Sequence, residues 1–454
     1  MHCRFLPPYL VNELAAGGAA RSSGPLTLRL DDELRARRAA PPRRLHARRA
    51  AGTGTRIVHT AHQTEQLPGD VVRTDGGPPT HDPAVDEAYE SSGQVWDLFQ
   101  REFRRSSVDG EGTPLSVTVH YGQDYDNAFW DGRQLVFGDG DGEIFERFTK
   151  PLDVLAHEFA HGVTQFTAGL NYQGQPGALN ESVSDVFAAM TRQRVLAQTA
   201  VEADWLIGVG LFADGVQATA LRSMLAPGTA YDDPRLGRDR QVGHWSSYVD
   251  TEEDSGGVHI NSGIPNRAFA EAARAIGGHC WKQPGQIWYD ALTSGEVGAQ
   301  TDFAEFAQAT ISSARRLYPS DPGVVAHVQA AWASVGVVAA PAVTRSDARA
   351  ATTTADQLIA VSRSGGFTGV PRSGEVDLNA DPAGDEIRSL LSTVDLDHFG
   401  GDATGADRFT YTVHYGPHHV VVPEQDLTPE LHRVVQLVLG AGRRASLPGP
   451  DELT

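Results

Sequence analysis

The sequence predicts an α+β protein with a β-rich N-terminal lobe, a helical C-terminal lobe and a small α+β domain after them. Residues 115 to 137 alternate β-forming and polar side chains, as half-buried strands do. After Pro151 the apolar residues recur with helical spacing. The stretch 339–356 is small, polar and aperiodic, and a strand pattern starts again beyond it, which indicates a linker and a further domain.

The length of 454 residues exceeds what one hydrophobic core usually serves, so two or three folding units are expected. Changes in composition and periodicity place the boundaries. The expected parts are an N-terminal segment at 1–55, the β-rich lobe and the helix after Pro151 at 56–165, the helical lobe at 166–338, the linker at 339–356 and the last domain at 357–445.

The first 55 residues differ from the rest of the chain. An apolar and aromatic start leads into arginines at positions 35, 37, 38, 43, 44, 48 and 49, around Pro41-Pro42. Such a run is either a solvated basic arm or the exposed, cleavable hinge of a pro-segment. Both interpretations remain open on composition alone.

Each lobe contains its own periodic segments. Strands are expected at 116–121 and 134–137, separated by a turn at Asp131-Gly132. A helix is expected from Leu152, with proline in its first turn and Gly169 at its end. Further helical segments are expected at 180–196, 264–276 and 303–335, and the last domain should contain strands at 358–362 and 408–413 and a helix at 431–439.

Charge and composition exclude several classes of function. The formal net charge of -20 opposes binding to nucleic acid or to an anionic membrane surface. No apolar run is long enough to span a bilayer. The first ten residues lack the apolar core of a secretory signal, so we expect a protein that is cytoplasmic as synthesised, with export by a non-classical route left open. Two cysteines are too few for a disulfide framework.

The pattern His157-Glu158-Phe159-Ala160-His161 predicts a zinc site on a helix. Histidines four residues apart project from the same helical face, so both imidazoles can reach one metal ion. Zinc lowers the pKa of a bound water, and a carboxylate must still accept the proton when that water attacks a carbonyl. Glu158 is the expected base. Two surface histidines on a helix would be the alternative explanation of this pattern.

A second motif supplies what the two histidines lack. Asn180-Glu181-Ser182-Val183-Ser184-Asp185 opens the next expected helix, about twenty residues later. A catalytic zinc takes three protein ligands, so Glu181 is the expected third ligand. Asp185, one turn further on, is expected to accept the other N–H of a ligand histidine.

Together these motifs resemble those of the thermolysin-like neutral zinc metallopeptidases, which implies their two-lobed fold. Asn127-Ala128-Phe129-Trp130 is similar to the edge strand of that family, implying that Asn127 and the Ala128 backbone bind an extended peptide. The stretch 254–263 resembles the family's active-site histidine motif. By this resemblance His259, oriented by Asp254, and Tyr172 stabilise the developing oxyanion.

The resemblance also implies how substrate is selected. Arg222 would hold the substrate carbonyl beyond the cleaved bond. A pocket after that bond would prefer a bulky apolar side chain, although ordinary core packing would explain its members almost as well. The residues that would line this pocket are Phe145, Phe148, Val154, Ile207 and Leu221.

The match weakens at the family's double calcium site. Asp153 and Asp204 stand at two of its positions, but the positions of further carboxylates hold Arg192, Leu206 and Val209. Calcium wants six to eight oxygen ligands and is repelled by an arginine, so calcium is not expected there.

This departure and the start Pro7-Pro8-Tyr9-Leu10 resemble the protealysin-type branch, with the resemblance covering about 1–337. The resemblance implies that the pro-segment occupies the cleft until its arginine-rich hinge is cut. Cys3 could then act as a zinc ligand in the precursor, or be a free apolar cysteine.

The last domain is similar to emfourin, a protein inhibitor of protealysin-like enzymes. The resemblance rests on the segments 362–369, 375–378 and 421–427, and it implies a fused inhibitor that could insert Gly365-Gly366 into the cleft. An accessory domain that only binds or stabilises is the alternative.

We therefore expect a zinc-dependent endopeptidase that cleaves before bulky apolar residues of protein or peptide substrates. A catalytically silent zinc- or peptide-binding protein, or an inhibitor-type interaction protein, is the competing hypothesis.

Overall fold

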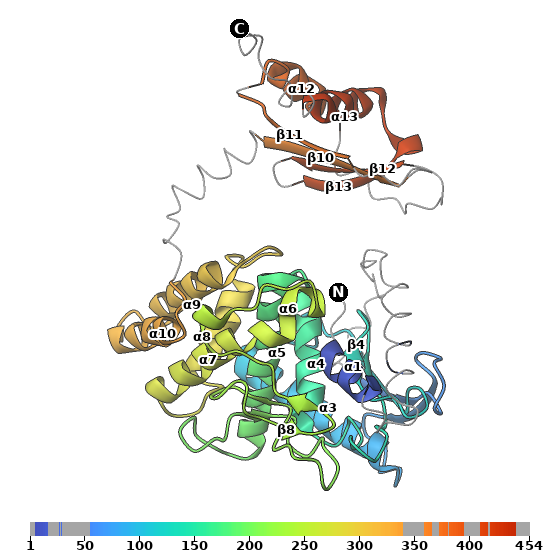
Figure 1. Ribbon diagram of the computed structural model, residues 1–454, viewed down its shortest axis with the longest axis vertical. Helices are drawn as coiled ribbons and strands as arrows, with labels where there is room; N and C mark the ends of the chain where they lie inside the picture. Colours follow the sequence, from blue (N-terminus) through green and yellow to red (C-terminus); the bar gives the residue numbers. More distant parts are fainter. Residues whose placement is uncertain are drawn as a thin grey trace. The chain divides into compact units, whose positions relative to one another are not determined.

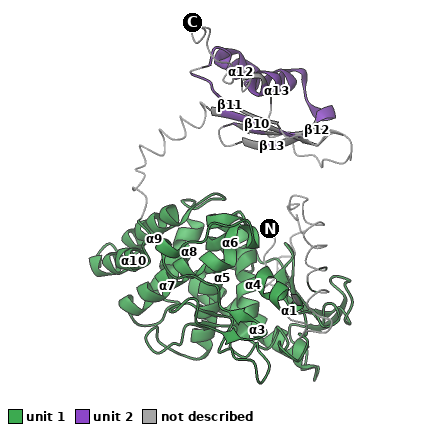
Figure 2. Ribbon diagram, in the orientation of Figure 1, with its two compact units in different colours: residues 1–341 green, residues 342–454 purple. Residues whose placement is uncertain are grey.

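The computed structural model describes residues 5–16, 27, 29, 55–338, 358–365, 372–379, 381–394, 409–415 and 418–441. The chain divides into two compact units, residues 1–341 and residues 342–454 (Figure 2). Cys3, the arginine-rich hinge, the linker at 339–356 and Gly366 lie outside the described residues, so the expectations for them stay predictions.

The N-terminal lobe of the first unit is built on a five-stranded sheet with the order β2-β1-β3-β5-β4. Its strands are β1 (Arg56–Thr60), β2 (Asp70–Thr74), β3 (Leu115–Val119), β4 (Ala128–Trp130) and β5 (Leu135–Phe137). The two expected strands are present as β3 and β5, which pair in parallel. β4 is an edge strand, so one side of it is open to pairing with another extended segment.

Helix α3 (Pro83–Phe103) packs against this sheet, and the sequence analysis did not identify it. Its start follows ordinary capping rules. Proline occupies the first turn, and the Asp82 carboxylate accepts a hydrogen bond from the Ala84 N–H at 3.0 Å.

The two helices that follow run through the centre of the unit (Figure 1). α4 (Leu152–Gln165) begins after Pro151, as expected, and ends four residues before Gly169. Gly169 has a φ of 61° and donates its N–H to the Thr164 carbonyl, so it turns the chain just beyond the helix. α5 is Gly174–Val195. It starts six residues before Asn180, so Glu181 lies inside the helix rather than in its first turn.

The rest of the first unit is mainly helical. Its elements are β6 (Leu206–Ile207), β7 (Arg222–Ser223), β8 (Asp232–Asp233), β9 (Gly237–Arg238), the short helix η1 (Trp245–Ser247), α6 (Asp254–Asn261), α7 (Gly263–Ile276), α8 (Gln283–Thr293), α9 (Phe303–Leu317) and α10 (Pro322–Ser334). The single helical stretch expected at 303–335 is two helices. Pro322 cannot continue the first, and Asp321 caps the second by accepting from the Gly323 N–H.

The second unit is an antiparallel sheet with the order β11-β10-β12-β13 and two helices. The elements are β10 (Leu358–Gly365), β11 (Arg372–Asp377), α12 (Gly384–Leu391), β12 (Phe409–Tyr415), β13 (His418–Pro423), η3 (Glu424–Asp426) and α13 (Pro429–Ala441). It has its own apolar core, to which the buried side chains of Val413, Leu431 and Val435 contribute.

The N-terminal segment is part of the first unit's core. α1 (Pro8–Ala16) follows Phe5 and Leu6, and both side chains are fully buried. Leu10 and Leu14 of α1 are buried in the same cluster. In the described part of the chain, no helix combines the length and the apolar character that a membrane span requires.

Candidate active site

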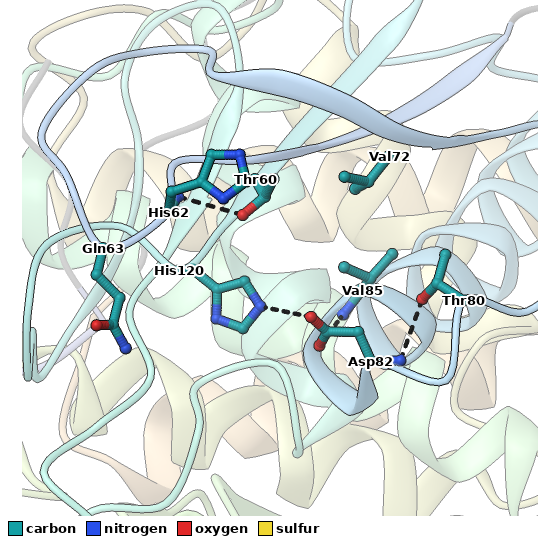
Figure 3. Close-up of a pocket in the computed structure, with 8 residues that line it drawn as sticks. All are labelled: Thr60, His62, Gln63, Val72, Thr80, Asp82, Val85 and His120. Carbon is teal, nitrogen blue, oxygen red and sulfur yellow. Dashed lines mark hydrogen bonds and ion pairs between the residues drawn. The ribbon is translucent and has the colours of Figure 1, made fainter.

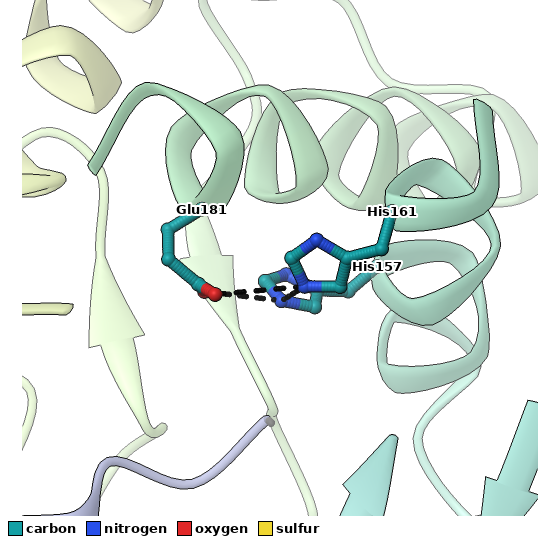
Figure 4. Close-up of side chains that lie close together, drawn as sticks. All are labelled: His157, His161 and Glu181. Atoms are coloured by element: carbon teal, nitrogen blue, oxygen red, sulfur yellow. Dashed lines mark hydrogen bonds and ion pairs between the residues drawn. The ribbon is translucent and has the colours of Figure 1, made fainter. Parts of the chain in front are cut away.

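Three side chains converge between α4 and α5 (Figure 4). His157 and His161 lie one turn apart on α4, with their Nε2 atoms 3.0 Å apart. The Glu181 carboxylate comes from α5 and lies 3.3 Å from His157 Nε2 and 3.6 Å from His161 Nε2. All three side chains are buried, with at most 1% exposed. Among the described residues, they form the one group of metal-ligand type whose donor atoms lie within 4.8 Å of each other.

The opposite ring nitrogen of each histidine is already hydrogen-bonded. His157 Nδ1 lies 2.9 Å from Asp185 Oδ1, as the sequence led us to expect. His161 Nδ1 lies 2.8 Å from Asn180 Oδ1 and 3.0 Å from the Ser184 hydroxyl. These partners favour N–H at Nδ1, which leaves both Nε2 lone pairs for a metal. Two imidazole nitrogens and one carboxylate are a donor set that suits zinc.

Asn180 and Ser184 were not assigned a role from the sequence. The available signal was their spacing. They lie four apart in the motif that also contains Glu181, so they project from one face of α5.

Asp185 is held from several sides. The Arg222 guanidinium donates to both of its oxygens, at 2.7 and 2.8 Å, and Asn266 Nδ2 donates to Oδ2 at 2.8 Å. Burial opposes the charge on Asp185, but Arg222 and His157 outweigh it and lower the pKa of the carboxyl to about 2. Asn266 comes from α7, 81 residues away, and no local pattern pointed to it.

Glu158 lies next to the convergent histidine pair and is fully buried. Burial raises the pKa of its carboxyl to about 7, with a smaller contribution from the Glu181 charge. A carboxylate with a pKa near neutrality can both accept and return a proton at physiological pH.

Tyr172 and His259 face the same centre from another direction. The Tyr172 hydroxyl donates to the Glu181 carboxylate and lies 3.4 Å from His259 Nε2. His259 Nδ1 lies 2.6 Å from Asp254 Oδ1, and the His259 backbone N–H donates to Asp254 Oδ2 at 2.8 Å. Asp254 therefore orients the ring. His259 lies in the second half of α6, after Ser255, Gly256 and Gly257, whose φ values are positive.

The edge strand β4 is paired with the chain's own N-terminal segment. The Phe5 N–H donates to the Ala128 carbonyl at 3.1 Å, and the Leu6 N–H donates to Asn127 Oδ1 at 2.9 Å. Arg222 Nη1 donates to the Phe5 carbonyl at 3.1 Å. The three groups expected to bind a peptide thus all bind residues 5 and 6.

The Phe5 ring lies beside the metal helix. It meets the His157 ring edge-on at 5.2 Å between centroids, and the Arg222 guanidinium lies 4.7 Å from its centre. A Cβ added at Gly208 would lie 3.1 Å from Leu221 Cβ and 3.6 Å from Phe5 Cε1, so Gly208 lies close to both side chains, and the part of Leu221 in the pocket stays a prediction. The other expected lining residues are at most 1% exposed, and their part in the pocket stays a prediction: Phe145, Phe148, Val154 and Ile207.

Arg192 and Asp204, which the resemblance places at positions of the family's calcium site, form an ion pair. Arg192 donates to both Asp204 oxygens, at 2.5 and 2.9 Å, and approaches the Leu206 carbonyl at 3.5 Å. Asp153 is buried and accepts from the Gly208 N–H at 2.9 Å, and burial raises the pKa of its carboxyl to about 6.

A different pocket, of about 540 Å³, lies in the N-terminal lobe near His120 (Figure 3). The His120 ring bridges Asp82 at 3.0 Å and Asp139 at 2.8 Å, so both of its nitrogens are engaged. These hydrogen bonds, Asp139 first, raise the pKa of His120 to about 9 against the effect of burial. This histidine is therefore a structural link rather than part of the active centre.

Comparison with known proteins agrees with this geometry. The family model for the thermolysin metallopeptidase catalytic domain matches residues 46–165, and the model for its alpha-helical domain matches residues 168–337. The emfourin family model matches residues 361–439.

Individual relatives match between 62% and 74% of this chain. An extracellular metalloprotease of Pectobacterium carotovorum subsp. carotovorum is 50% identical over 337 residues, 74% of this chain and 96% of that protein. Protease PrtS of Photorhabdus sp. (strain Az29) is 44% identical over 284 residues, 62% of this chain and 76% of that protein. The solved precursor of protealysin, a metalloproteinase from Serratia proteamaculans, is 47% identical, covers 74% of this chain and 100% of its own, and has a TM-score of 0.68.

The expectation of a cytoplasmic protein is wrong. The Pectobacterium relative is named an extracellular metalloprotease, which points to secretion. The expectation rested on the missing apolar core in the first ten residues. That feature concerns one kind of export signal and carries no information about other routes.

Proposed function

This chain belongs to the thermolysin metallopeptidase family, and from that premise we propose how its own residues hydrolyse a peptide bond. It is a metalloendopeptidase made as a precursor. The observation that carries the assignment of its site is the convergence of His157, His161 and Glu181 in a buried centre beside Glu158.

His157, His161 and Glu181 would hold the zinc ion. Asp185 and Asn180 would keep the two imidazoles oriented toward it, each through a hydrogen bond to Nδ1. When bound there, zinc supplies Lewis-acid polarisation of the peptide carbonyl and lowers the pKa of the attacking water.

Glu158 would take the proton from the attacking water and pass it to the leaving amine. Its burial supports this assignment, because a carboxylate with a raised pKa accepts a proton more readily than an exposed one. Tyr172 and His259 would donate hydrogen bonds to the oxygen of the attacked carbonyl as negative charge develops on it. Asp254 contributes by holding the His259 ring in one orientation.

Substrate would bind as an additional strand along β4. The Ala128 carbonyl and the Asn127 amide would bind the peptide backbone, and Arg222 would donate to a substrate carbonyl, as all three now do with residues 5 and 6. The pocket that holds the Phe5 ring favours a bulky apolar side chain, so cleavage is expected on the N-terminal side of such residues.

The N-terminal segment would act as an intramolecular inhibitor. Phe5 and Leu6 use the hydrogen-bond partners that a substrate needs, and the segment is anchored by the buried face of α1. A chain in this state excludes peptides until the segment is removed. The emfourin-like unit would supply a second inhibitory part.

We further propose that the double calcium site of the family is replaced in this chain. The Arg192 guanidinium supplies the positive charge that Asp204 needs, and Leu206 and Val209 offer no carboxylates. A calcium ion would meet an arginine where it needs oxygen ligands.

The proposed site is tested by chelating the metal of the purified chain, adding zinc back, and measuring casein hydrolysis after maturation. Activity should disappear and return. Glu158→Gln should abolish activity but retain zinc, whereas Glu143→Gln, on an exposed loop, should leave both unchanged. Zinc bound without any cleavage by the matured wild-type chain would contradict the proposed function and favour a catalytically silent binding protein.

The emfourin-like unit needs its own test. A chain ending at Val338 should mature faster than the full chain, and adding the separately produced residues 342–454 should inhibit it. Equal rates for the two chains, together with no inhibition on addition, would leave only an accessory function for this unit.

A further inference from the structure

A pocket of about 520 Å³ lies between the loop at 226–229 and α7, and none of the proposed catalytic groups lines it. Three arginines contribute to its walls: Arg238, Arg240 and Arg267. A smaller neighbouring pocket of about 280 Å³ shares Arg238 and the backbone of the same loop, so this arginine borders both. Three guanidinium groups thus meet at one hollow, and the Asp239 carboxylate belongs to the same wall.

The basic pocket, meaning the hollow lined by Arg238, Arg240 and Arg267, adjoins the cleft. The Arg240 guanidinium lies 4.6 Å from the centre of the Tyr9 ring, and Tyr9 follows Phe5 by four residues. On its other side, the Val242 N–H of the pocket wall donates to the Ile260 carbonyl at 3.0 Å, next to His259 in the chain. The N-terminal segment therefore passes the basic pocket where it begins α1.

The arginines keep most of their hydrogen-bonding capacity. Arg240 forms an ion pair with Glu253 at 3.6 Å and Arg267 forms one with Glu271 at 3.7 Å, and both distances are longer than a hydrogen bond. The Arg238 side chain is exposed and makes no ion pair with any residue within the described ranges. Each guanidinium therefore still has N–H groups that can bind an anion.

The carboxylate in the pocket wall does not neutralise these arginines by direct pairing. Asp239 is 6% exposed. It accepts the backbone N–H groups of Gly228 and Ala230 at 3.1 Å each, and that of Gln241 at 3.0 Å. Its hydrogen bonds hold the loop that lines the pocket.

We propose that the basic pocket binds an acidic side chain of the substrate, about four residues after the residue that fills the apolar pocket. The proposal rests on the proposed peptidase function and adds a second element of specificity to it. A carboxylate matches the planar donor pairs of arginine, and the contact is strengthened by charge. A peptide is the expected ligand because the chain's own Tyr9 already lies against Arg240.

The test compares two internally quenched peptides that differ at one position. Both have phenylalanine after the cleaved bond, and the fourth residue beyond it is glutamate in one and glutamine in the other. The matured chain should cleave the glutamate peptide with a kcat/KM about five- to tenfold higher, the size expected for charge-assisted contacts in a partly exposed pocket. The preference should shrink when the ionic strength is raised from about 0.05 M to about 0.5 M.

Variants assign the preference to the pocket. Arg238→Gln combined with Arg267→Gln should reduce the preference below about twofold by lowering kcat/KM for the glutamate peptide. Arg274→Gln removes an exposed arginine of the same helix as Arg267 and should leave the preference intact. A preference that survives the double substitution would overturn the assignment.

Binding of both peptides, measured by fluorescence anisotropy, separates the two proposals. Equal cleavage and equal binding of the two peptides by the wild-type chain would overturn the basic pocket and leave the peptidase function standing. Tighter binding of the glutamate peptide without cleavage of either would contradict the peptidase function and support the pocket.

Discussion

Replacing Phe5 by alanine should open the cleft of the precursor. The Phe5 side chain is fully buried between the His157 ring and the Arg222 guanidinium. Truncating a buried phenylalanine costs about 3 to 5 kcal/mol, and here most of that loss falls on the docked state of the N-terminal segment. At about 1.4 kcal/mol per factor of ten, a loss of 3 kcal/mol raises the fraction of open cleft about a hundredfold.

The assay measures binding of a fluorescent phenylalanine-containing peptide to the zinc-loaded full chain, in a Glu158→Gln background that prevents self-processing. Phe5→Ala should tighten the apparent affinity for the peptide by up to about a hundredfold, and the gain ends once the cleft is open in every molecule. Phe306→Ala is the matched control, because Phe306 is equally buried in α9 and far from β4 in the chain. Unchanged peptide affinity in Phe5→Ala, with zinc content equal to that of the parent, would refute the idea that residues 5 and 6 block the cleft.

Three further predictions follow from single contacts. Treatment with EGTA, which binds calcium, should leave the Tm unchanged, and a drop in Tm with EGTA alone would argue for a bound calcium. Arg192→Ala should lower the free energy of unfolding by about 1 to 2 kcal/mol, because Asp204 loses its partner. His120→Asn, which tolerates the φ of 55°, should cost roughly 1 to 3 kcal/mol. Because the pKa of His120 is raised to about 9, its charged form stabilises the fold fully below about pH 6.5, and this contribution is lost as the pH rises through 9. Denaturant unfolding should therefore show a lower free energy of unfolding for His120→Asn than for the wild type at pH 6, and this difference should vanish near pH 10. Asn266→Ala should lower kcat about tenfold with little change in KM, because Asp185 loses one of the hydrogen bonds that hold its carboxylate in place. An unchanged kcat would show that Asn266 does not support the site.

Local spacing was enough to identify the centre of the site. His157 and His161 are four residues apart, and an α-helix brings such residues onto one face whatever surrounds it. The second motif works in the same way, since Glu181 and Asp185 are one turn apart on α5. The expectation that calcium is absent came from the family resemblance, which puts Arg192 where a carboxylate would be, and it stays a prediction.

Local patterns predicted the ends of helices and the breaks between elements less well. α5 begins at Gly174, earlier than the motif suggested, because its first turns carry few apolar residues that would reveal a period. The break between α9 and α10 was missed although Pro322 marks it. Cellular location was misjudged because the absence of one kind of signal was taken to describe the route of the whole protein.

The sequence by itself identified the residue types of a possible metal site and the carboxylate beside the two histidines, since residue type and spacing within one helix can be seen in the chain. Only the tertiary structure decided what surrounds them. Asn266 reaches Asp185 from 81 residues away, and the Phe5 carbonyl meets Arg222 across 217 residues. Contacts of that range are set by how helices and strands pack, and a local pattern carries no record of the packing partner. The same holds for the basic pocket, whose arginines come from a strand, a loop and a helix.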